Sequence, residues 1–253
     1  MDVHRLGGGG GYMAGNQVAK APHGITAYFL SLVFLASAGL VLATAGPPAG
    51  PPAPMPSWVE WPGGDHAITT TEVTVEQYLA CVDEGACDPA NHRDCNSADP
   101  ARVLHPMNCV NWFGASQYCA WSGGRLCAED EWIDACGGAG EGRGWPYGYV
   151  FESGRCNVQS TSEPVEGLER ASAPVASMPG CEGGLGGLYD MAGNVSEWLA
   201  ACKQDYCKFR GAGYLSNDPV DVFTGCGGVC AGNKKPFMSG TVGIRCCRDI
   251  TAG

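Results

Sequence analysis

Cysteines limit the folds open to this sequence, which contains fifteen of them. All fifteen lie between positions 81 and 247 of a 253-residue sequence, after an apolar segment at 25–45. Disulfides form and persist in oxidising compartments, so this placement predicts an exported, cross-linked domain. Structural zinc is the competing interpretation, but paired Cys-x2-Cys knuckles are absent and only five histidines occur. Because fifteen is odd, at least one thiol is unpaired, intermolecular or bound to something else.

The apolar segment, residues 25–45, reads "ITAYFLSLVFLASAGLVLATA". Its length favours an uncleaved transmembrane anchor, whereas "ATA" at 43–45 satisfies the small-x-small rule for signal peptidase, and both interpretations stay open. Arg5 and Lys20 precede it, so the positive-inside tendency assigns residues 1–24 to the cytoplasm. We therefore expect the rest of the chain to be extracytoplasmic, either membrane-anchored or secreted.

The exported part is expected to hold one domain. Residues 46–56, "GPPAGPPAPMP", form a Pro-rich linker, and the domain occupies 57–253. The 39 glycines and 17 prolines, against 16% charged residues, indicate a loop-rich globule rather than a helical bundle or an open parallel sheet. The net charge of −11 argues against nucleic-acid binding, which needs a basic face.

Local signals predict three helices in this domain. The first, within 72–85, has a possible capping box at Thr74 and Gln77, and the others fall within 111–124 and 128–136. Residues 137–187 are rich in Gly, Pro and Ser, and only loops and short strands are expected there. The closing stretch 240–249 has β-type character and is expected to pair with the early part of the domain.

Several stretches, in order, resemble one family, the formylglycine-generating enzymes or sulfatase-modifying factors. The resemblance covers roughly 65–249, and its most specific pieces are "HPMNCVNWFGASQYCAWSGGRLCAEDEW" (105–132) and "GLYDMAGNVSEW" (187–198). Shorter matches are "TTEVTVEQYLAC", "GWPYG", "CNV", "SAPVASMP", "FRGAGY" and "GIRC". The resemblance implies an α+β fold of the C-type-lectin-like kind, with about three helices, short strands and many loops.

The resemblance also implies two disulfides. Cys119 would pair with Cys246, and Cys136 most plausibly with Cys230. The other eleven cysteines are extras whose connectivity cannot be read from sequence. We expect Cys226 to join an extra disulfide, and the adjacent Cys246 and Cys247 to bond to separate partners.

The family's enzymes use a cysteine pair that holds copper(I) to oxidise a substrate cysteine, in a Cys-x-Pro-x-Arg motif, to formylglycine with dioxygen. Here Ser216 stands where the first copper-binding thiol belongs, Gly213 replaces the motif's serine, and Ser196 replaces an active-site tryptophan. A hydroxyl is a hard ligand that suits copper(I) poorly. Cys226 and Cys230, a Cys-x3-Cys pair, are the remaining candidates for a displaced metal or redox site.

The loop that matches 190–197 holds calcium in the family's enzymes, which implies Asp190 and Glu197 as side-chain ligands and Gly193 and Val195 as backbone ligands. Two carboxylates on a short loop suit a hard cation that takes six to eight oxygens. The alternative is a capping box, in which Asn194 and Glu197 begin a helix.

A second calcium site in the family implies Asn157 and Val158 as ligands, with Glu166 or Glu169 as the acid. The alternative is that Asn157 is a turn residue whose side chain bonds its own backbone.

The sequence therefore predicts an exported domain of the sulfatase-modifying-factor type with a degenerate oxidase site. The favoured function is a non-catalytic, calcium-stabilised binding or scaffold module for an unknown protein or small-molecule ligand, in contact with the membrane only through an uncleaved 25–45. The alternative is a formylglycine-generating oxidase that uses copper(I) and oxygen. A purified domain that forms the aldehyde on a peptide with the Cys-x-Pro-x-Arg motif would establish the alternative.

Overall fold

A computed structural model describes most of the domain; residues 1–53, which contain the apolar segment, lie outside the described part. The described ranges are 54–90, 92–158, 171–215, 225–228 and 230–250. Within these ranges, no helix combines the length and apolar character that crossing a membrane requires.

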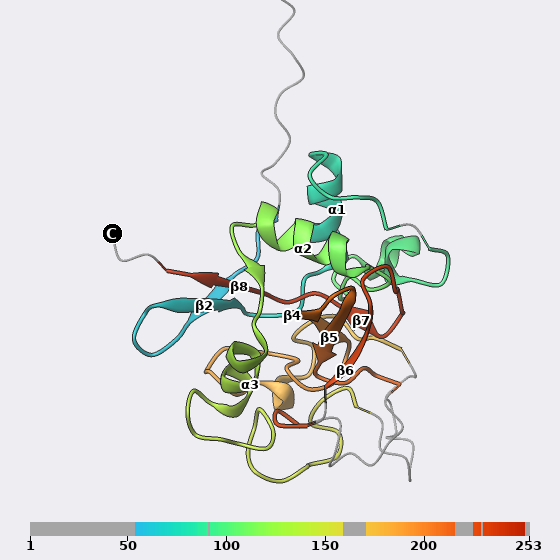
Figure 1. Cartoon of the computed structure of the whole chain (residues 1–253). Coiled ribbons are helices and arrows are strands. Elements are labelled where there is room, and N and C mark those ends of the chain that lie inside the picture. Colours follow the sequence, from blue (N-terminus) through green and yellow to red (C-terminus); the bar gives the residue numbers. More distant parts are fainter. Residues whose placement is uncertain (1–53, 91, 159–170, 216–224, 229, 251–253) are drawn as a thin grey trace, which may run out of the picture. The chain divides into compact units, whose positions relative to one another are not determined.

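Three α-helices are present where local signals predict them (Figure 1): α1 (Val75–Asp83), α2 (Trp112–Trp121) and α3 (Glu129–Gly137). The capping box of α1 is confirmed, because the Thr74 hydroxyl accepts from the Gln77 amide while the Gln77 side chain accepts from the Thr74 amide. The third helix begins with Glu131 accepting from the Ala128 amide and ends at Gly138, whose φ of 91° suits a residue without Cβ.

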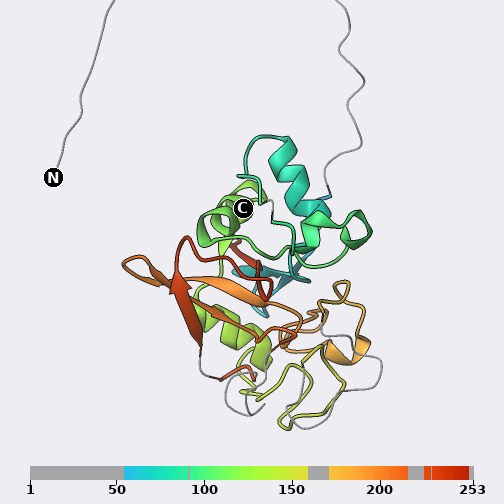
Figure 2. The same cartoon turned by 90° about the vertical axis from the view of Figure 1, so that its right-hand side faces the viewer.

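Two four-stranded sheets complete the domain (Figures 1 and 2), as expected for an α+β fold. The first sheet is antiparallel with the order β1 (Trp58–Glu60), β2 (His66–Thr69), β8 (Cys246–Asp249), β3 (Arg125–Leu126). The second has the order β6 (Ala231–Lys234), β5 (Tyr206–Arg210), β4 (Ser196–Lys203), β7 (Val242–Gly243), and only the β4–β7 pair is parallel. The predicted return of 240–249 to the early domain is confirmed by the β2–β8 pairing. The described parts of 137–187 contain loops and the 3₁₀ helix Pro179–Cys181.

Adjacent cysteines on β8 fasten that strand on both of its faces. Successive side chains of a strand point to opposite faces, so Cys246 and Cys247 enter different core clusters. Cys246 bonds Cys119 of α2, in agreement with the resemblance, and Cys247 bonds Cys127 just before α3. The expectation that these two cysteines have separate partners is confirmed.

The disulfide implied between Cys136 and Cys230 is wrong. Cys136 bonds Cys226, and Cys230 is the free cysteine of the chain. The Cys226 amide donates to the Gly144 carbonyl at 2.8 Å, which holds residue 226 against the loop that follows α3. Cys230 instead directly precedes β6. The remaining bridges are Cys81–Cys87, Cys95–Cys109, Cys156–Cys181 and Cys202–Cys207.

The two disulfides of β8 both join this strand to the segment 119–127. Their contributions to the free energy of unfolding are therefore predicted to be non-additive. While one bridge is intact, the other closes a loop of only about ten residues, and its loss costs about 3 kcal/mol in the loop-entropy model. Removing both reopens a much longer loop. In urea unfolding, Cys119→Ala/Cys246→Ala and Cys127→Ala/Cys247→Ala together should destabilise by on the order of 1 kcal/mol more than the sum of the two double substitutions. Strict additivity would show that the bridges act independently.

Candidate functional site

The loop before β4 turns sharply without starting a helix. Asp190, Gly193 and Asn194 have φ values of 59°, 93° and 57°, and the chain then enters the strand β4 at Ser196. The helix-start interpretation of Asn194 and Glu197 is therefore wrong: the backbone leaves this loop extended, and the Asn194 side chain bonds residues far away in sequence. Asp190 and Glu197 both end in the protein interior, with exposed fractions of 3% and 0%.

A third buried carboxylate, which the sequence analysis missed, supports this loop. Glu72 lies between β2 and α1 and is fully buried. Its Oε1 accepts from the Val195 amide at 2.8 Å, and its Oε2 accepts from the Asn194 side-chain amide at 2.6 Å. In the sequence, Glu72 is only the first residue of the stretch 72–85 that is expected to contain a helix, and nothing local indicates a contact with a segment more than 120 positions away.

One buried cation faces these acids. Arg245 is fully buried and donates from Nε to Glu197 Oε1 at 2.7 Å. Its two terminal nitrogens donate to the carbonyls of Thr69 and Tyr189, each at 2.7 Å. The other oxygen of Glu197 accepts from the indole nitrogen of Trp132.

The three carboxylates carry more negative charge than Arg245 neutralises. Burial raises the pKa of Glu72 well above its usual value, and the charges of Asp190 and Glu197 raise it further. Burial also raises the pKa of Asp190 and of Glu197, although Arg245 opposes both shifts. If all three carboxylates are ionised, the cluster with its one guanidinium has a net charge of −2, which one divalent cation would neutralise. Carboxylate oxygens are the kind of ligand that calcium takes.

The second predicted calcium position has an unsatisfied oxygen. Asn157 is 2% exposed, and its side-chain nitrogen donates to the Ala171 carbonyl at 3.0 Å and to Asn194 Oδ1 at 3.2 Å. Its Oδ1 is buried and has no hydrogen-bond partner in the described part of the chain. The alternative, in which this side chain bonds its own backbone, is therefore wrong. Val158, the other predicted ligand, is buried beside it, whereas Glu166 and Glu169 lie outside the described residues.

The positions that match the family's oxidase site hold small residues. A Cβ atom on Gly213 would lie 2.8 Å from Cβ of Thr241, so a serine there requires the neighbouring segment to shift. Ser196, where the family has tryptophan, is 8% exposed, and its amide donates to the Thr241 carbonyl at 2.8 Å. Ser216 lies outside the described residues.

The two candidate cysteines do not form a thiol pair. Cys226 is bonded to Cys136, which leaves Cys230 as a single thiol. It hydrogen-bonds Glu129, a carboxylate that also pairs with Lys208 and Arg210 at 2.6 Å. Although burial opposes the shift, these partners lower the pKa of Glu129 to about 2.

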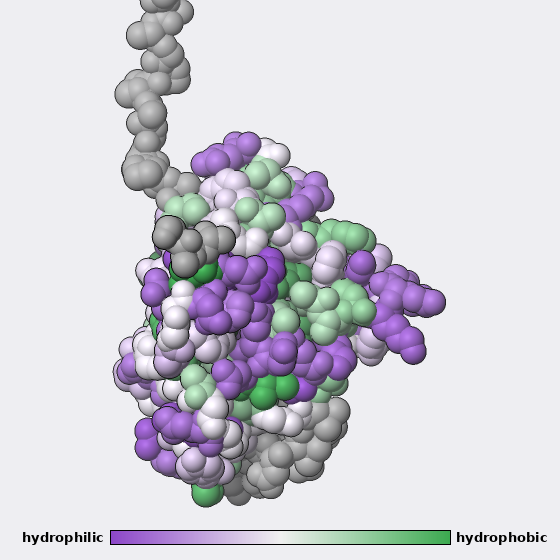
Figure 3. All heavy atoms as spheres, turned by 60° about the vertical axis from the view of Figure 1, so that its left-hand side comes forward, coloured by the Kyte–Doolittle hydropathy of each residue, from purple (hydrophilic) through white to green (hydrophobic). Residues whose placement is uncertain are grey.

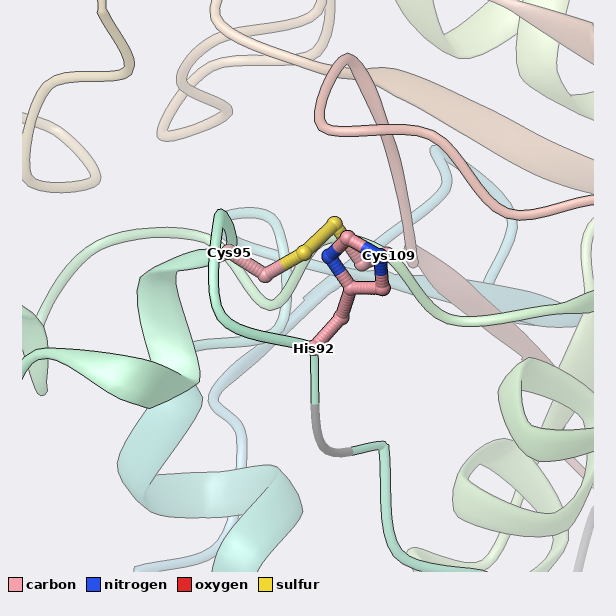
Figure 4. A group of neighbouring side chains, drawn as sticks. All are labelled: His92, Cys95 and Cys109. Carbon is pink, nitrogen blue, oxygen red and sulfur yellow. A yellow bond between two sulfur atoms is a disulfide. The ribbon is translucent and has the colours of Figure 1, made fainter.

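A histidine beside two sulfurs elsewhere resembles a metal centre but is not one. His92 lies next to Cys95 and Cys109 (Figure 4), but the two sulfurs are bonded to each other. Disulfide sulfurs are not the thiolates that bind zinc or copper.

Comparison with known proteins gives the family. The profile described as "Sulfatase-modifying factor enzyme 1-like domain" matches residues 54–250, so the chain belongs to the sulfatase-modifying factor family of formylglycine-generating-enzyme-like domains. It is 34% identical to the inactive C-alpha-formylglycine-generating enzyme 2 of Bos taurus over 57% of this chain and 50% of that protein. It is 36% identical to the formylglycine-generating enzyme of Mus musculus over 53% of this chain and 46% of that protein. The chain thus spans about half the length of these two relatives.

Solved structures support the fold. The structure of PvdO from Pseudomonas aeruginosa superimposes with a TM-score of 0.55 at 21% identity, covering 73% of this chain and 80% of that one. The structure of CarF gives a TM-score of 0.54 at 24% identity, covering 74% and 87%. At these identities the likeness shows the fold alone. The seven disulfides agree with an extracytoplasmic location.

Because Arg245 is the cation that pairs with this buried cluster, we predict that removing its charge lowers the free energy of unfolding substantially. Arg245→Gln leaves buried carboxylates without a partner, and we expect it to destabilise by about 3–5 kcal/mol in urea unfolding at constant calcium. Adding Glu197→Gln should recover part of this loss, because the unpaired charge is then removed. Arg248→Gln, three residues further along on β8 and partly exposed, is the control and should cost about 1 kcal/mol or less. Equal effects at 245 and 248 would contradict the prediction.

Proposed function

We propose that this protein is an extracytoplasmic, non-catalytic member of its family, stabilised by calcium and acting as a binding or scaffold module. The main support for this proposal is that fourteen of the fifteen cysteines are in disulfides and so cannot act as thiolate ligands. Copper(I) favours soft thiolate ligands, and the family's chemistry uses two of them. Cys230 alone offers one.

The pocket positions support the same conclusion. Gly213 has Thr241 packed against it where the motif's serine would need room, and Ser196 lacks the indole of the family's enzymes. The similarity to an inactive relative in cattle adds support, but the similarity to active formylglycine-generating enzymes keeps the oxidase as the alternative.

Calcium in this proposal has a structural role. Asp190 and Glu197, with the carbonyls of Gly193 and Val195, would hold the ion in a cluster whose net charge it neutralises. Asn157, through its unpartnered Oδ1, and Val158 would contribute to a second site. Each bound ion stabilises the folded state because the unfolded chain does not present these ligands together.

The partner is a protein or a small molecule, not a nucleic acid, because the net charge of the chain is −11. The apolar segment at 25–45 would act either as a membrane anchor or as a cleaved signal peptide. In the first case the Pro-rich linker would separate the domain from the membrane surface.

Calcium is expected to raise the melting temperature of the chelator-treated protein. At free calcium one hundred times the dissociation constant, one site contributes about 2.7 kcal/mol. Asp190→Asn should abolish most of this shift, because the substitution removes a charged ligand. Asp83→Asn, which alters an exposed acid at the end of α1, should leave the shift intact. A calcium shift of equal size in both variants would rule out the loop as the site.

The oxidase alternative is tested by an aldehyde assay. The full-length protein, loaded with copper(I) in air, is incubated with a peptide that carries the Cys-x-Pro-x-Arg motif, next to an active formylglycine-generating enzyme as positive control. We expect mass spectrometry to detect no formylglycine above the level without protein. Formation of the aldehyde would overturn the non-catalytic proposal.

A further inference from the structure

A cluster outside the site described above lies at one end of β2 and β8, the two central strands of the first sheet. His66, the first residue of β2, is the cross-strand partner of Asp249, the last residue of β8. Glu131, in the first turn of α3, and Arg125 of β3 complete the group. Figure 1 shows the β2–β8 ribbon that carries it, and Figure 3 turns this side of the molecule forward, where hydrophilic residues cover much of the middle.

Three ligand atoms in this cluster have the spacing of a metal centre. His66 Nδ1 lies 3.3 Å from Asp249 Oδ1 and 3.9 Å from Glu131 Oε1. All three atoms lie within 4.8 Å of one another. Ligands around a tetrahedral zinc ion with bonds of about 2.0–2.1 Å are separated by about 3.3 Å. Small side-chain adjustments would therefore bring the set onto one ion.

The ring of His66 is oriented so that Nδ1 could bind a metal ion. His66 Nδ1 is buried and faces two carboxylates, and its 3.3 Å contact with Asp249 Oδ1 does not have the geometry of a full hydrogen bond. The other ring nitrogen lies 3.6 Å from Asp65 Oδ2. Zinc-binding histidines commonly donate their second N–H to a carboxylate, which leaves the first nitrogen free for the metal. Asp65 is near enough to accept that N–H after a small shift of its side chain.

Arg125 now supplies the positive charge between the two acids. One terminal nitrogen lies 2.6 Å from both Glu131 Oε1 and Asp249 Oδ1. The side chain is 38% exposed, so it has a route into solvent. If it left, Glu131 Oε1 would become available, while Oε2 would remain held by the Ala128 amide at 2.8 Å.

We propose that His66, Glu131 and Asp249 form an exchangeable zinc site in which Arg125 occupies the place of the ion when zinc is absent. A ligand set of one imidazole and two carboxylates suits zinc better than calcium, which takes oxygen ligands. Water fills the fourth position. The ion joins the end of β8 to β2 and α3.

The test is zinc titration of the full-length protein against a fluorescent chelator, with calcium saturating and in a Cys230→Ser background so that no free thiol competes. We expect one zinc ion to bind, and His66→Gln to weaken binding at least tenfold. Arg125→Gln should tighten binding severalfold, because it removes the competing cation. His92→Gln, at a histidine beside a disulfide, should change nothing.

Two results would overturn the proposal. One is the absence of zinc binding in the background protein. The other is an equal loss in the His66 and His92 variants, which would indicate adventitious surface binding. Cobalt(II) provides an independent measurement, since a tetrahedral site in the native protein gives intense visible bands that His66→Gln should remove. Weak octahedral bands that are unchanged in His66→Gln would count against the site.

Discussion

The domain depends on one buried cation. Arg245 reaches the Thr69 carbonyl at the end of β2, the Tyr189 carbonyl ahead of the acidic loop, and Glu197 on β4. Leaving a buried charge unpaired costs several kcal/mol, so all of these segments must keep their positions together. The guanidinium thereby couples the first sheet, the second sheet and the acidic loop in a single arrangement.

The residues on either side of Arg245 hold it in place. Gly243 pairs with Glu197 across β7 and β4, and the Ile244 carbonyl accepts from the Val73 amide at 2.9 Å. Cys246 and Cys247 then fasten β8 to both core clusters. Because the backbone is fixed before and after position 245, the long side chain loses little further freedom when it pairs with Glu197.

Short-range signals and the family motifs account for the parts of the fold that sequence predicts correctly. The capping box of Thr74 and Gln77, which spans four residues, predicts the start of a helix. The family motifs predict the disulfide between Cys119 and Cys246. Long-range disulfide pairing is harder to predict, because Cys226 and Cys230 are only four residues apart and the sequence does not distinguish them as partners for Cys136. The Cys226 amide donates to the Gly144 carbonyl, and this contact depends on the conformation of a loop whose presence, but not whose path, local signals predict.

The candidate site shows the same division. Asp190 and Glu197 are found from the motif, whereas Glu72 and Arg245 are missed. Each of the missed residues lies far from the loop in sequence and acts on it only after folding. Their charges decide the electrostatics: Glu72 adds the third negative charge, and Arg245 removes one. The alternative of a helix start at Asn194 is wrong for a related reason, since its side chain bonds Glu72 instead of capping a local turn.

Strand geometry explains how the pocket positions can change while the acidic cluster is kept. Ser196 and Glu197 are neighbours on β4, so their side chains point to opposite faces. Glu197 faces Arg245 and Trp132, and the Ser196 amide is held by Thr241, the residue packed against Gly213. Substitutions on the Ser196 face therefore leave the charge balance around Glu197 untouched. A chain can lose the family's oxidase residues on one face and retain, on the other, the acids and the arginine that hold the fold together.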